Sequence, residues 1–262
     1  MAMDQLVADA CAGRPPVTIT AWRHDGGFPT ATKPQKLTCS DNALYNVKFA
    51  GNTHGDGRGI YTEQVVALCA ALIDAPVPVV ELIDVPEHIA EGIRQDKVAL
   101  NLNFDPQAGV HHGSRWADNH SERAELEHFE DNRQRFGALD VLYMWLTCSA
   151  DHQWIYANDP PHHVLSVDHT CFLPAGPAWT DGLLASEAGT VTPDATLAGL
   201  GLQPADRASA LSLLAQVDDN QVAAVVARPP DEWGIAMAER VAVAEFVVTR
   251  KNAALAYYAG SP

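Results

Sequence analysis

Two aspartates that end elements of different type constrain the fold of this chain more than any other feature. Residues 136–147 carry apolar side chains at helical spacing, and the predicted helix ends before the short polar segment that contains Asp151. Residues 154–157 and 164–167 favour β-structure and are separated by turn residues, which predicts a hairpin with Asp168 directly after its second strand. The sequence therefore predicts a helix, a loop aspartate, a hairpin and a strand-end aspartate in succession.

The predicted hairpin brings the carboxyl groups of Asp151 and Asp168 to the same edge of the structure. A single loop aspartate is usually a capping or turn residue, but two carboxylates at one edge favour a divalent cation. Neither carboxylate then needs to protonate, because the metal carries the opposite charge. We therefore expect a metal site at this edge.

A lysine in a strand and a glutamate in the following helix form a second pattern. Residues 45–50 alternate as a strand that contains Lys48, and residues 61–73 are predicted as a helix with Glu63 in its first turn. Taken singly, a strand lysine is usually exposed, and a glutamate near a helix N-terminus is explained by the helix dipole. Together they match the ion pair that positions ATP phosphates in kinases.

These patterns resemble those of the HipA-like kinases, bacterial relatives of the eukaryotic protein kinases. Five stretches carry the resemblance, in the family's order between about residues 35 and 180, namely 46–52, 63–72 with 75–79, 109–114, 149–152 and 166–169. Residues 228–233, Arg-Pro-Pro-Asp-Glu-Trp, resemble the segment before the family's last helices. The resemblance implies an α+β, protein-kinase-like fold of two lobes. A small antiparallel sheet lobe that binds nucleotide would span residues 1–104, and a mainly helical catalytic lobe would span residues 105–262.

The resemblance also implies a function, which is the transfer of the γ-phosphoryl group of ATP, bound with Mg²⁺, to a hydroxyl group. It implies that this hydroxyl belongs to a Ser or Thr of a protein substrate. Lys48 would contact the phosphates, and Glu63 would hold Lys48 in place. Asp151 would accept the proton of the attacking hydroxyl group.

Two departures from the family pattern concern the metal site. The family usually carries Asn-x-Asp-Arg-His with a metal-binding Asn a few residues later, whereas here Ser149 replaces the first Asn and the Arg is absent. The metal is assigned to Asp168 together with Gln153 or, as an open alternative, Asn158, because both amides offer a carbonyl oxygen. Thr170 stands where the family often has glycine, and a side chain restricts φ there. These departures motivate an alternative function, a pseudokinase that binds a nucleotide or a partner without turnover.

A glycine-containing turn near the N-terminus is assigned to the phosphates. Residues 17–22 and 35–39 are predicted as strands, and Gly26 and Gly27 lie in the turn-rich segment between them. Such a turn can cover phosphates as a glycine-rich loop does, although Gly26-Gly27 is not Gly-x-Gly-x-x-Gly. An ordinary surface loop is the alternative.

A hinge for the adenine ring is assigned farther along the chain. Residues 98–103, Val-Ala-Leu-Asn-Leu-Asn, are predicted as the fifth strand of the sheet. In a kinase-like fold the backbone after that strand holds adenine. Asn101 and Asn103 are therefore assigned to nucleotide binding.

Several histidines near these motifs raise the alternatives of a zinc site and of a metal-dependent hydrolase. They are His111, His112, His152, His162, His163 and His169. Adjacent histidines do not easily point both rings at one metal, and no His-Glu-x-x-His motif or cysteine ligand set accompanies them. We expect His152 and His169 instead to orient the aspartates that precede them through hydrogen bonds.

The composition limits the partners. A formal net charge of −16 over 262 residues argues against binding to nucleic acid or to an anionic membrane, because most faces would repel phosphate groups. The five cysteines form no Cys-x-x-Cys pair and are odd in number, which indicates reduced thiols. The first residues lack a signal-peptide pattern, and no apolar stretch approaches about 18 residues. A soluble, cytoplasmic protein is expected.

Overall fold

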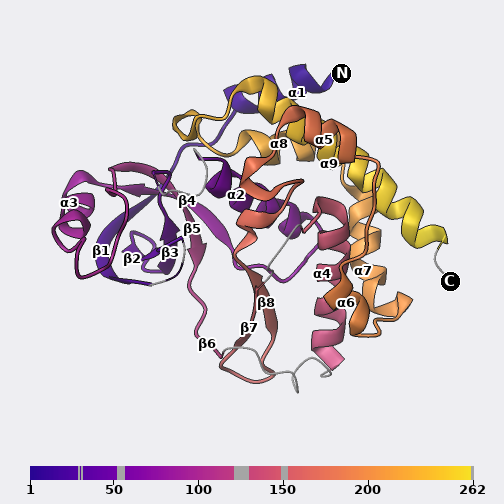
Figure 1. Ribbon diagram of the computed structural model, residues 1–262, viewed down its shortest axis with the longest axis horizontal. Coiled ribbons are helices and arrows are strands. Elements are labelled where there is room, and N and C mark those ends of the chain that lie inside the picture. Colours follow the sequence, from indigo (N-terminus) through magenta and orange to yellow (C-terminus); the bar gives the residue numbers. More distant parts are fainter. Residues whose placement is uncertain (29, 31, 52–56, 121–129, 149–152, 261–262) are drawn as a thin grey trace.

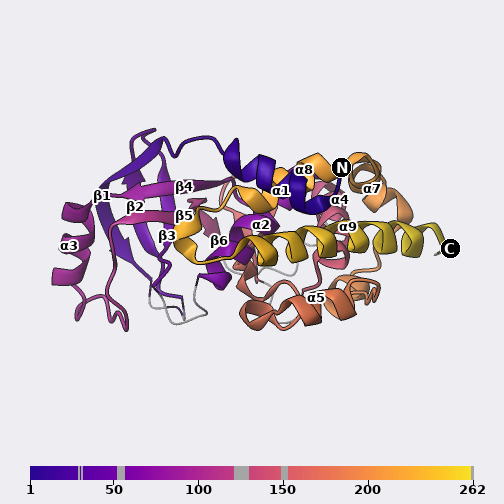
Figure 2. The same ribbon diagram turned by 90° about the horizontal axis from the view of Figure 1, so that it is seen from above.

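The computed structural model describes residues 1–28, 30, 32–51, 57–120, 130–148 and 153–260. It places a five-stranded β-barrel at one end of an elongated molecule and a body of helices at the other (Figure 1). The N-terminal helix α1 (Met3–Ala12) packs against the helical body, although the barrel follows it in the sequence. Figure 2 shows the last helix, α9 (Met237–Gly260), lying along the long axis of the molecule.

The barrel is closed by strands in the order β1-β2-β3-β5-β4. Their bounds are Ile19–Gly27 for β1, Gln35–Cys39 for β2, Leu44–Lys48 for β3, Val80–Val85 for β4 and Gly109–Arg115 for β5. Neighbouring strands are antiparallel except β1 and β4, which pair in parallel where Ile19 faces Ile83. The predicted antiparallel sheet is therefore corrected to a closed barrel, in which the parallel pair joins the two edges that an open sheet would expose.

The prediction of a strand at residues 98–103 is wrong. After β4 the chain forms α3 (Glu87–Gln95) and then turns, in which the N–H group of Leu102 donates to the carbonyl oxygen of Lys97. Leu102 is buried in the core of the barrel, whereas Val98 is 93% exposed. Leu102 thus reaches the core from a turn, and β5 is the fifth strand instead.

The division of the chain at residue 104 stays a prediction. β5 follows this point in the sequence and pairs with both β3 and β4, so it belongs to the barrel. Residues 116–118 then lead from β5 to β6 (Asn119–His120), which pairs with the hairpin outside the barrel.

The predicted hairpin is confirmed as β7 (Gln153–Ala157) and β8 (Val164–Val167), and β6 extends it to a three-stranded sheet. The helix before it is α4 (Glu130–Leu146), which begins earlier than the predicted residue 136. Gln153 faces Val167 across the hairpin, so the start of β7 and the end of β8 lie together. Asp168 follows this end directly, as the sequence predicts.

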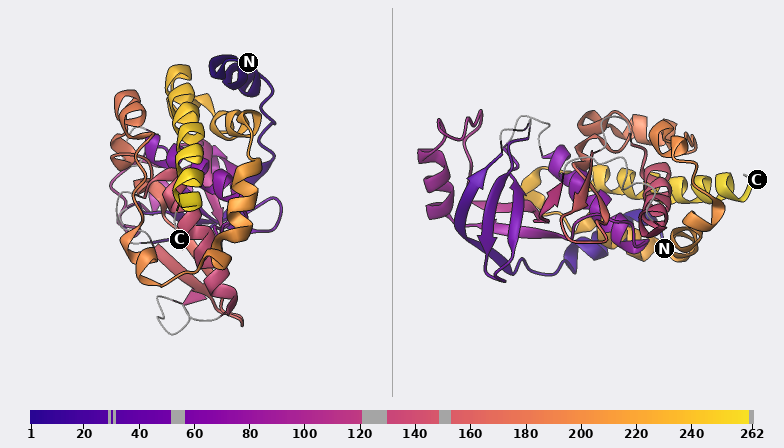
Figure 3. Two further views of the ribbon diagram at one scale, coloured as in Figure 1. Left: turned by 90° about the vertical axis from the view of Figure 1, so that its right-hand side faces the viewer. Right: turned by 90° about the horizontal axis from the view of Figure 1, so that it is seen from below.

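The helices predicted at about 204–217, 219–227 and 235–257 are confirmed. They are α7 (Pro204–Gln216), α8 (Asp219–Ala227) and α9, and the short helices α5 (Asp181–Glu187) and α6 (Ala195–Gly199) precede them. Figure 3 shows α9 between α5 and α7 when the molecule is viewed from its helical end. No helix in the described part of the chain is both long enough and apolar enough to cross a lipid bilayer.

Two hydrophobic cores stabilise the fold, one inside the barrel and a larger one among the helices. The helix α2 (Arg58–Leu72) belongs to the larger core, and nearly all its residues from Gly59 to Ala70 are buried. Burial on every side is the property of an interior helix, because a surface helix keeps one polar face. α2 lies between the barrel and the other helices (Figure 1), so a charged residue on it requires a partner inside the protein.

The packing of α4 against α7 can be tested by substitution at a point of close approach. A Cβ atom at Gly137 would lie 2.0 Å from the backbone oxygen of Asp206, so the backbone must shift to accommodate a side chain. We expect Gly137→Ala to lower the free energy of unfolding by about 1–3 kcal/mol in urea denaturation. Gly92→Ala is the matched control, because Gly92 lies within α3 with no atom within 4 Å, and alanine should stabilise that helix by up to about 1 kcal/mol. Equal effects of the two substitutions would contradict the packing.

Candidate active site

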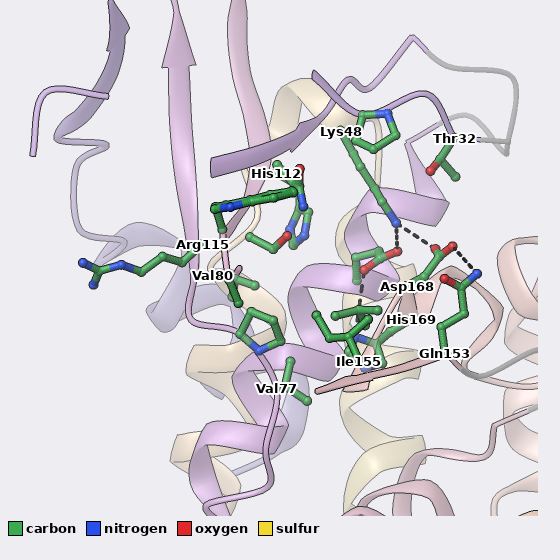
Figure 4. Close-up of a pocket in the computed structure, with 18 of the residues that line it drawn as sticks. Thr32, Lys48, Val77, Val80, His112, Arg115, Gln153, Ile155, Asp168 and His169 are labelled. Carbon is green, nitrogen blue, oxygen red and sulfur yellow. Dashed lines mark hydrogen bonds and ion pairs between the residues drawn. The ribbon is translucent and has the colours of Figure 1, made fainter. Parts of the chain in front are cut away.

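A cavity of about 250 Å³ lies between the outer face of the barrel and the hairpin β7–β8 (Figure 4). The polar residues that line it include Lys48 and His112 from the barrel, Glu63 from α2, Gln153 from β7 and Asp168 after β8. Figure 4 shows the side chains of Lys48, Gln153 and Asp168 converging, whereas the guanidinium group of Arg115 points away from them. The cavity therefore combines charged groups from three separate parts of the chain.

Lys48 faces the cavity because of the alternation of β3. Tyr45 and Val47 are buried in the barrel core, so Asn46 and Lys48 project to the opposite face and line the cavity. The side chain of Lys48 is only 12% exposed. An ammonium group with so little access to water requires compensation by nearby carboxylates.

Glu63 and Asp168 supply this compensation. The Lys48 ammonium group forms an ion pair with Glu63 and a second one, at 2.8 Å, between its Nζ atom and Asp168 Oδ1. Burial would lower the pKa of Lys48, but the negative charges of Glu63 and Asp168 outweigh it, and the pKa is raised. Lys48 is therefore charged at neutral pH.

Glu63 lies deeper in its helix than the sequence predicts. α2 begins at Arg58, so Glu63 is in the second turn, and only 4% of the residue is exposed. Burial would raise the pKa of Glu63, but the positive charge of Lys48 outweighs it and holds the pKa well below its usual range. Glu63 is thus a buried carboxylate that stays ionised.

Asp168 adopts a left-handed backbone conformation. Its φ of 61° lies in the left-handed region, which aspartate tolerates better than most residues. Thr170 lies in the short 3₁₀ turn His169–Cys171, and the positive φ falls on Asp168 rather than on Thr170. The expected restriction at Thr170 therefore imposes no strain there. Its hydroxyl group instead donates a hydrogen bond of 2.7 Å to Glu63 Oε1.

Of the two candidate amide ligands, Gln153 and Asn158, only Gln153 lies next to Asp168. Its Nε2 atom lies 3.4 Å from Asp168 Oδ2, at the start of β7 (Figure 4). Asn158 lies in the turn at the other end of the hairpin, where its backbone N–H donates to Asp118, and it is not part of the cavity lining. Gln153 therefore lies beside Asp168, whereas Asn158 lies at the far end of the hairpin.

A chain of buried hydrogen bonds supports the loop after β8. Trp154 Nε1 donates to the Tyr143 hydroxyl at 3.1 Å, which lies 2.6 Å from Ser166 Oγ, and Ser166 Oγ lies 2.9 Å from His169 Nε2. The other ring nitrogen of His169 lies 3.9 Å from Glu63 Oε2. Burial lowers the pKa of His169 to about 4, so the ring is neutral at pH 7. His169 thus faces Glu63, whereas the sequence assigned it to Asp168.

The remaining predicted residues have different outcomes. Asp151 and His152 lie outside the described residues. Gly26 and Gly27 end β1 and do not line the cavity, although Phe28, which follows them, does. The role of the two glycines in phosphate binding stays a prediction.

The strand on which the hinge assignment of Asn101 and Asn103 depends is absent, because residues 98–103 form turns, and their role in nucleotide binding stays a prediction. Both residues lie in the turns after α3, where the Asn101 carbonyl accepts a hydrogen bond from Lys33, and neither lines the cavity. The residues after β5, beginning with Trp116, line the cavity instead. The ring of Trp116 stacks on Phe28 with centroids 5.5 Å apart. In the sequence, the signal that could have located this part of the cavity is an aromatic residue, Trp116, directly after the last barrel strand.

The histidines do not assemble a metal centre in the described part of the chain, where no group of three or more His, Cys, Asp or Glu side chains could hold an ion. His111 packs on Phe49 and its Nε2 atom lies 2.8 Å from the Gln107 carbonyl oxygen. His112 Nδ1 lies 2.8 Å from Gln64 Oε1. The two adjacent rings thus have different partners.

Comparison with known proteins bears on the fold. No protein-family model matches the sequence, and no curated protein sequence matches it. The structure is similar to the crystal structure of the Helicobacter pylori proinflammatory kinase CtkA, with a TM-score of 0.59 and 10% sequence identity. The alignment covers 94% of this chain and 98% of that chain. The two proteins share a fold. The chain is therefore an α+β protein with the fold of a kinase, and its chemistry must be argued from the site.

The buried charge of Glu63 predicts a pH-dependent stability. Because its pKa is lower in the folded protein, its contribution is fully present above the unfolded-state pKa of about 4.3 and is lost as the pH falls toward the folded value. We expect Glu63→Gln to lower the free energy of unfolding by about 3 kcal/mol at pH 7, measured by urea denaturation, and the difference from the parent to shrink below about pH 4.

Glu87→Gln is the control for this prediction. Glu87 also contacts a cation, Arg94, but its side chain is 70% exposed, so an effect below about 1 kcal/mol is expected. A difference between Glu63→Gln and the parent that is the same at pH 7 and pH 3 would contradict the assignment of a buried, ionised Glu63.

Proposed function

We propose that this chain is a HipA-like kinase that binds Mg²⁺ and ATP in the cavity and transfers the γ-phosphoryl group to a hydroxyl group. The observation that carries the proposal is the cluster of Lys48, Glu63 and Asp168 at the cavity, in a fold shared with a kinase. We take the acceptor to be a Ser or Thr of a protein and the location to be cytoplasmic, as the sequence predicts.

The residues at the cavity fit the groups that the proposal requires. Asp168 offers carboxylate oxygens and Gln153 an amide oxygen. Because the amide nitrogen of Gln153 faces Asp168, the amide must flip by about 180° before its oxygen can bind the same ion. Magnesium prefers such oxygen ligands and, when bound with ATP, neutralises the charge of the phosphate groups. Apolar residues such as Val80 and Ile155 line the cavity and suit a planar base.

The roles of the chain's own residues follow from their charges. Lys48 keeps its proton and so presents a positive charge to phosphate oxygens, while Glu63 fixes the position of that charge. Asp151 is the proposed base that accepts the proton of the acceptor hydroxyl group. Catalysis in this site would consist mainly of positioning and of charge stabilisation.

A second candidate function is a pseudokinase that binds a nucleotide or a partner without turnover. Ser149 stands where the family has Asn, and the two proposed metal ligands already contact each other, with Gln153 donating to Asp168. Asp168 is also paired with Lys48. Both contacts compete with a metal ion for the oxygens of Asp168, which favours weak or absent turnover.

Nucleotide binding is tested by thermal stability. A ligand that binds only the folded state stabilises it by RT ln(1 + [L]/Kd), which is about 2.7 kcal/mol at a concentration of 100 Kd. We expect Mg-ATP to raise the Tm of the parent protein and to leave that of Lys48→Ala nearly unchanged. Lys97→Ala is the matched control, because Lys97 also forms an ion pair, with Asp105, but does not line the cavity. If Mg-ATP raised the Tm of Lys48→Ala and of the parent by the same amount, Lys48 would have no role in phosphate binding.

Turnover is tested by two aspartate variants incubated with labelled ATP and Mg²⁺. We expect Asp168→Asn to weaken magnesium-dependent nucleotide binding, because its carboxylate is the proposed metal ligand. Asp151→Asn should leave binding nearly intact and lower the rate of phosphoryl transfer by at least about 100-fold, the usual size of a general-base contribution. Binding without any transfer in the parent would favour the pseudokinase.

A further inference from the structure

The hydroxyl group of Thr170 belongs to a cluster of polar side chains around the Lys48 ammonium group. Lys48 contacts Glu63 Oε1 and Asp168 Oδ1. Thr170 Oγ1 lies 2.7 Å from the same Glu63 oxygen and 3.3 Å from the same Asp168 oxygen. A hydroxyl group has one hydrogen to donate, and the shorter distance assigns it to Glu63. Lys48 from β3, Glu63 from α2, and Asp168 and Thr170 from the loop after β8 thus form one compact polar cluster.

The buried carboxylate of Glu63 depends on this hydroxyl group. An ionised carboxylate can accept about four hydrogen bonds, and each one that is missing in a buried site leaves it less stable. Oε1 receives Lys48 and Thr170, whereas Oε2 faces His169 at 3.9 Å, beyond the range of a hydrogen bond. Thr170, itself 7% exposed, is therefore the uncharged donor that fixes the orientation of the Glu63 carboxylate.

Metal binding at Asp168 would change how charge is shared within this cluster. A metal ion bound by Asp168 would compete with the Lys48 ammonium group for the negative charge of that carboxylate, so Glu63 would become the main carboxylate partner of Lys48. Glu63 would in turn retain Thr170. The hydroxyl group thus becomes more important when Asp168 shares its charge with a metal ion.

We propose that Thr170 is a positioning residue that holds the Glu63 carboxylate, and through it the Lys48 ammonium group, when Asp168 turns to a metal-bound nucleotide. This inference rests on the proposed function for the nucleotide, but the Thr170–Glu63 contact itself does not. The residue that departs from the family's glycine pattern is then part of the site. It adds a contact that glycine cannot make.

The experiment uses Thr170→Val, which keeps the shape but removes the hydroxyl group, and Thr170→Ser, which keeps the hydroxyl group. Thr249→Val is the control, because Thr249 is an exposed threonine on α9 that is not part of the cavity lining. In a double-mutant cycle of Thr170→Val with Glu63→Gln, we expect the two effects on the unfolding equilibrium constant to be non-additive by about tenfold. Additive effects would overturn the Thr170–Glu63 contact, whatever the function.

The functional arm measures Mg-ATP affinity and phosphoryl transfer in the same variants. We expect Thr170→Val to lower kcat/KM, or the affinity if the parent does not turn over, by about tenfold, as expected for a hydrogen bond to a charged group. Thr170→Ser should restore both to within about twofold of the parent. A Thr170→Val protein that is less stable but binds and transfers like the parent would overturn the positioning role. A parent that binds no Mg-ATP would overturn the proposed function instead, and the double-mutant cycle would still decide the contact.

Discussion

The burial of one ammonium group links the two parts of this molecule. Lys48 lies at the end of a barrel strand with 12% of its side chain exposed, and removing such a charge from water costs several kcal/mol unless opposite charges replace the water. Glu63 on α2 and Asp168 after β8 provide those charges. The barrel, the interior helix and the hairpin must therefore keep one relative arrangement, because a shift of any of them leaves at least one buried charge without its partner.

The C-terminal segment sets where the helix with Glu63 begins. Gly57 precedes α2 with a φ of 79°, and a Cβ atom there would lie 2.0 Å from the backbone oxygen of Trp233. Arg58, the first residue of α2, forms an ion pair with Glu239 at the start of α9. The glycine thus serves a close backbone contact. The start of α2, and with it the position of Glu63, depends on residues far away in the sequence.

Local patterns predicted the elements that local physics determines. The strands β2 and β3, the hairpin and the three last helices follow from alternation, helical periodicity and turn residues, and they are confirmed. The error at residues 98–103 has a non-local cause, because Leu100 and Leu102 pack on the barrel core from turns after α3. Closure of the barrel is non-local as well, since Ile19 and Ile83 pair in parallel across a long stretch of chain. Neither feature leaves a signal within a short window of sequence.

In the candidate site too, some residues could be predicted from local sequence patterns and others could not. Lys48 and Glu63 could be paired from the sequence because a strand and the next helix are neighbours in space, and Asp168 because it ends a hairpin strand. Thr170 could not be assigned, since its partner Glu63 lies more than a hundred residues earlier. A glycine replaced by threonine indicates lost function only if that position carries the left-handed backbone. Here Asp168 carries it, at a φ of 61°, so the threonine is free to use its hydroxyl group on the buried carboxylate. The physical meaning of a departure from a motif therefore depends on the backbone conformation at that position.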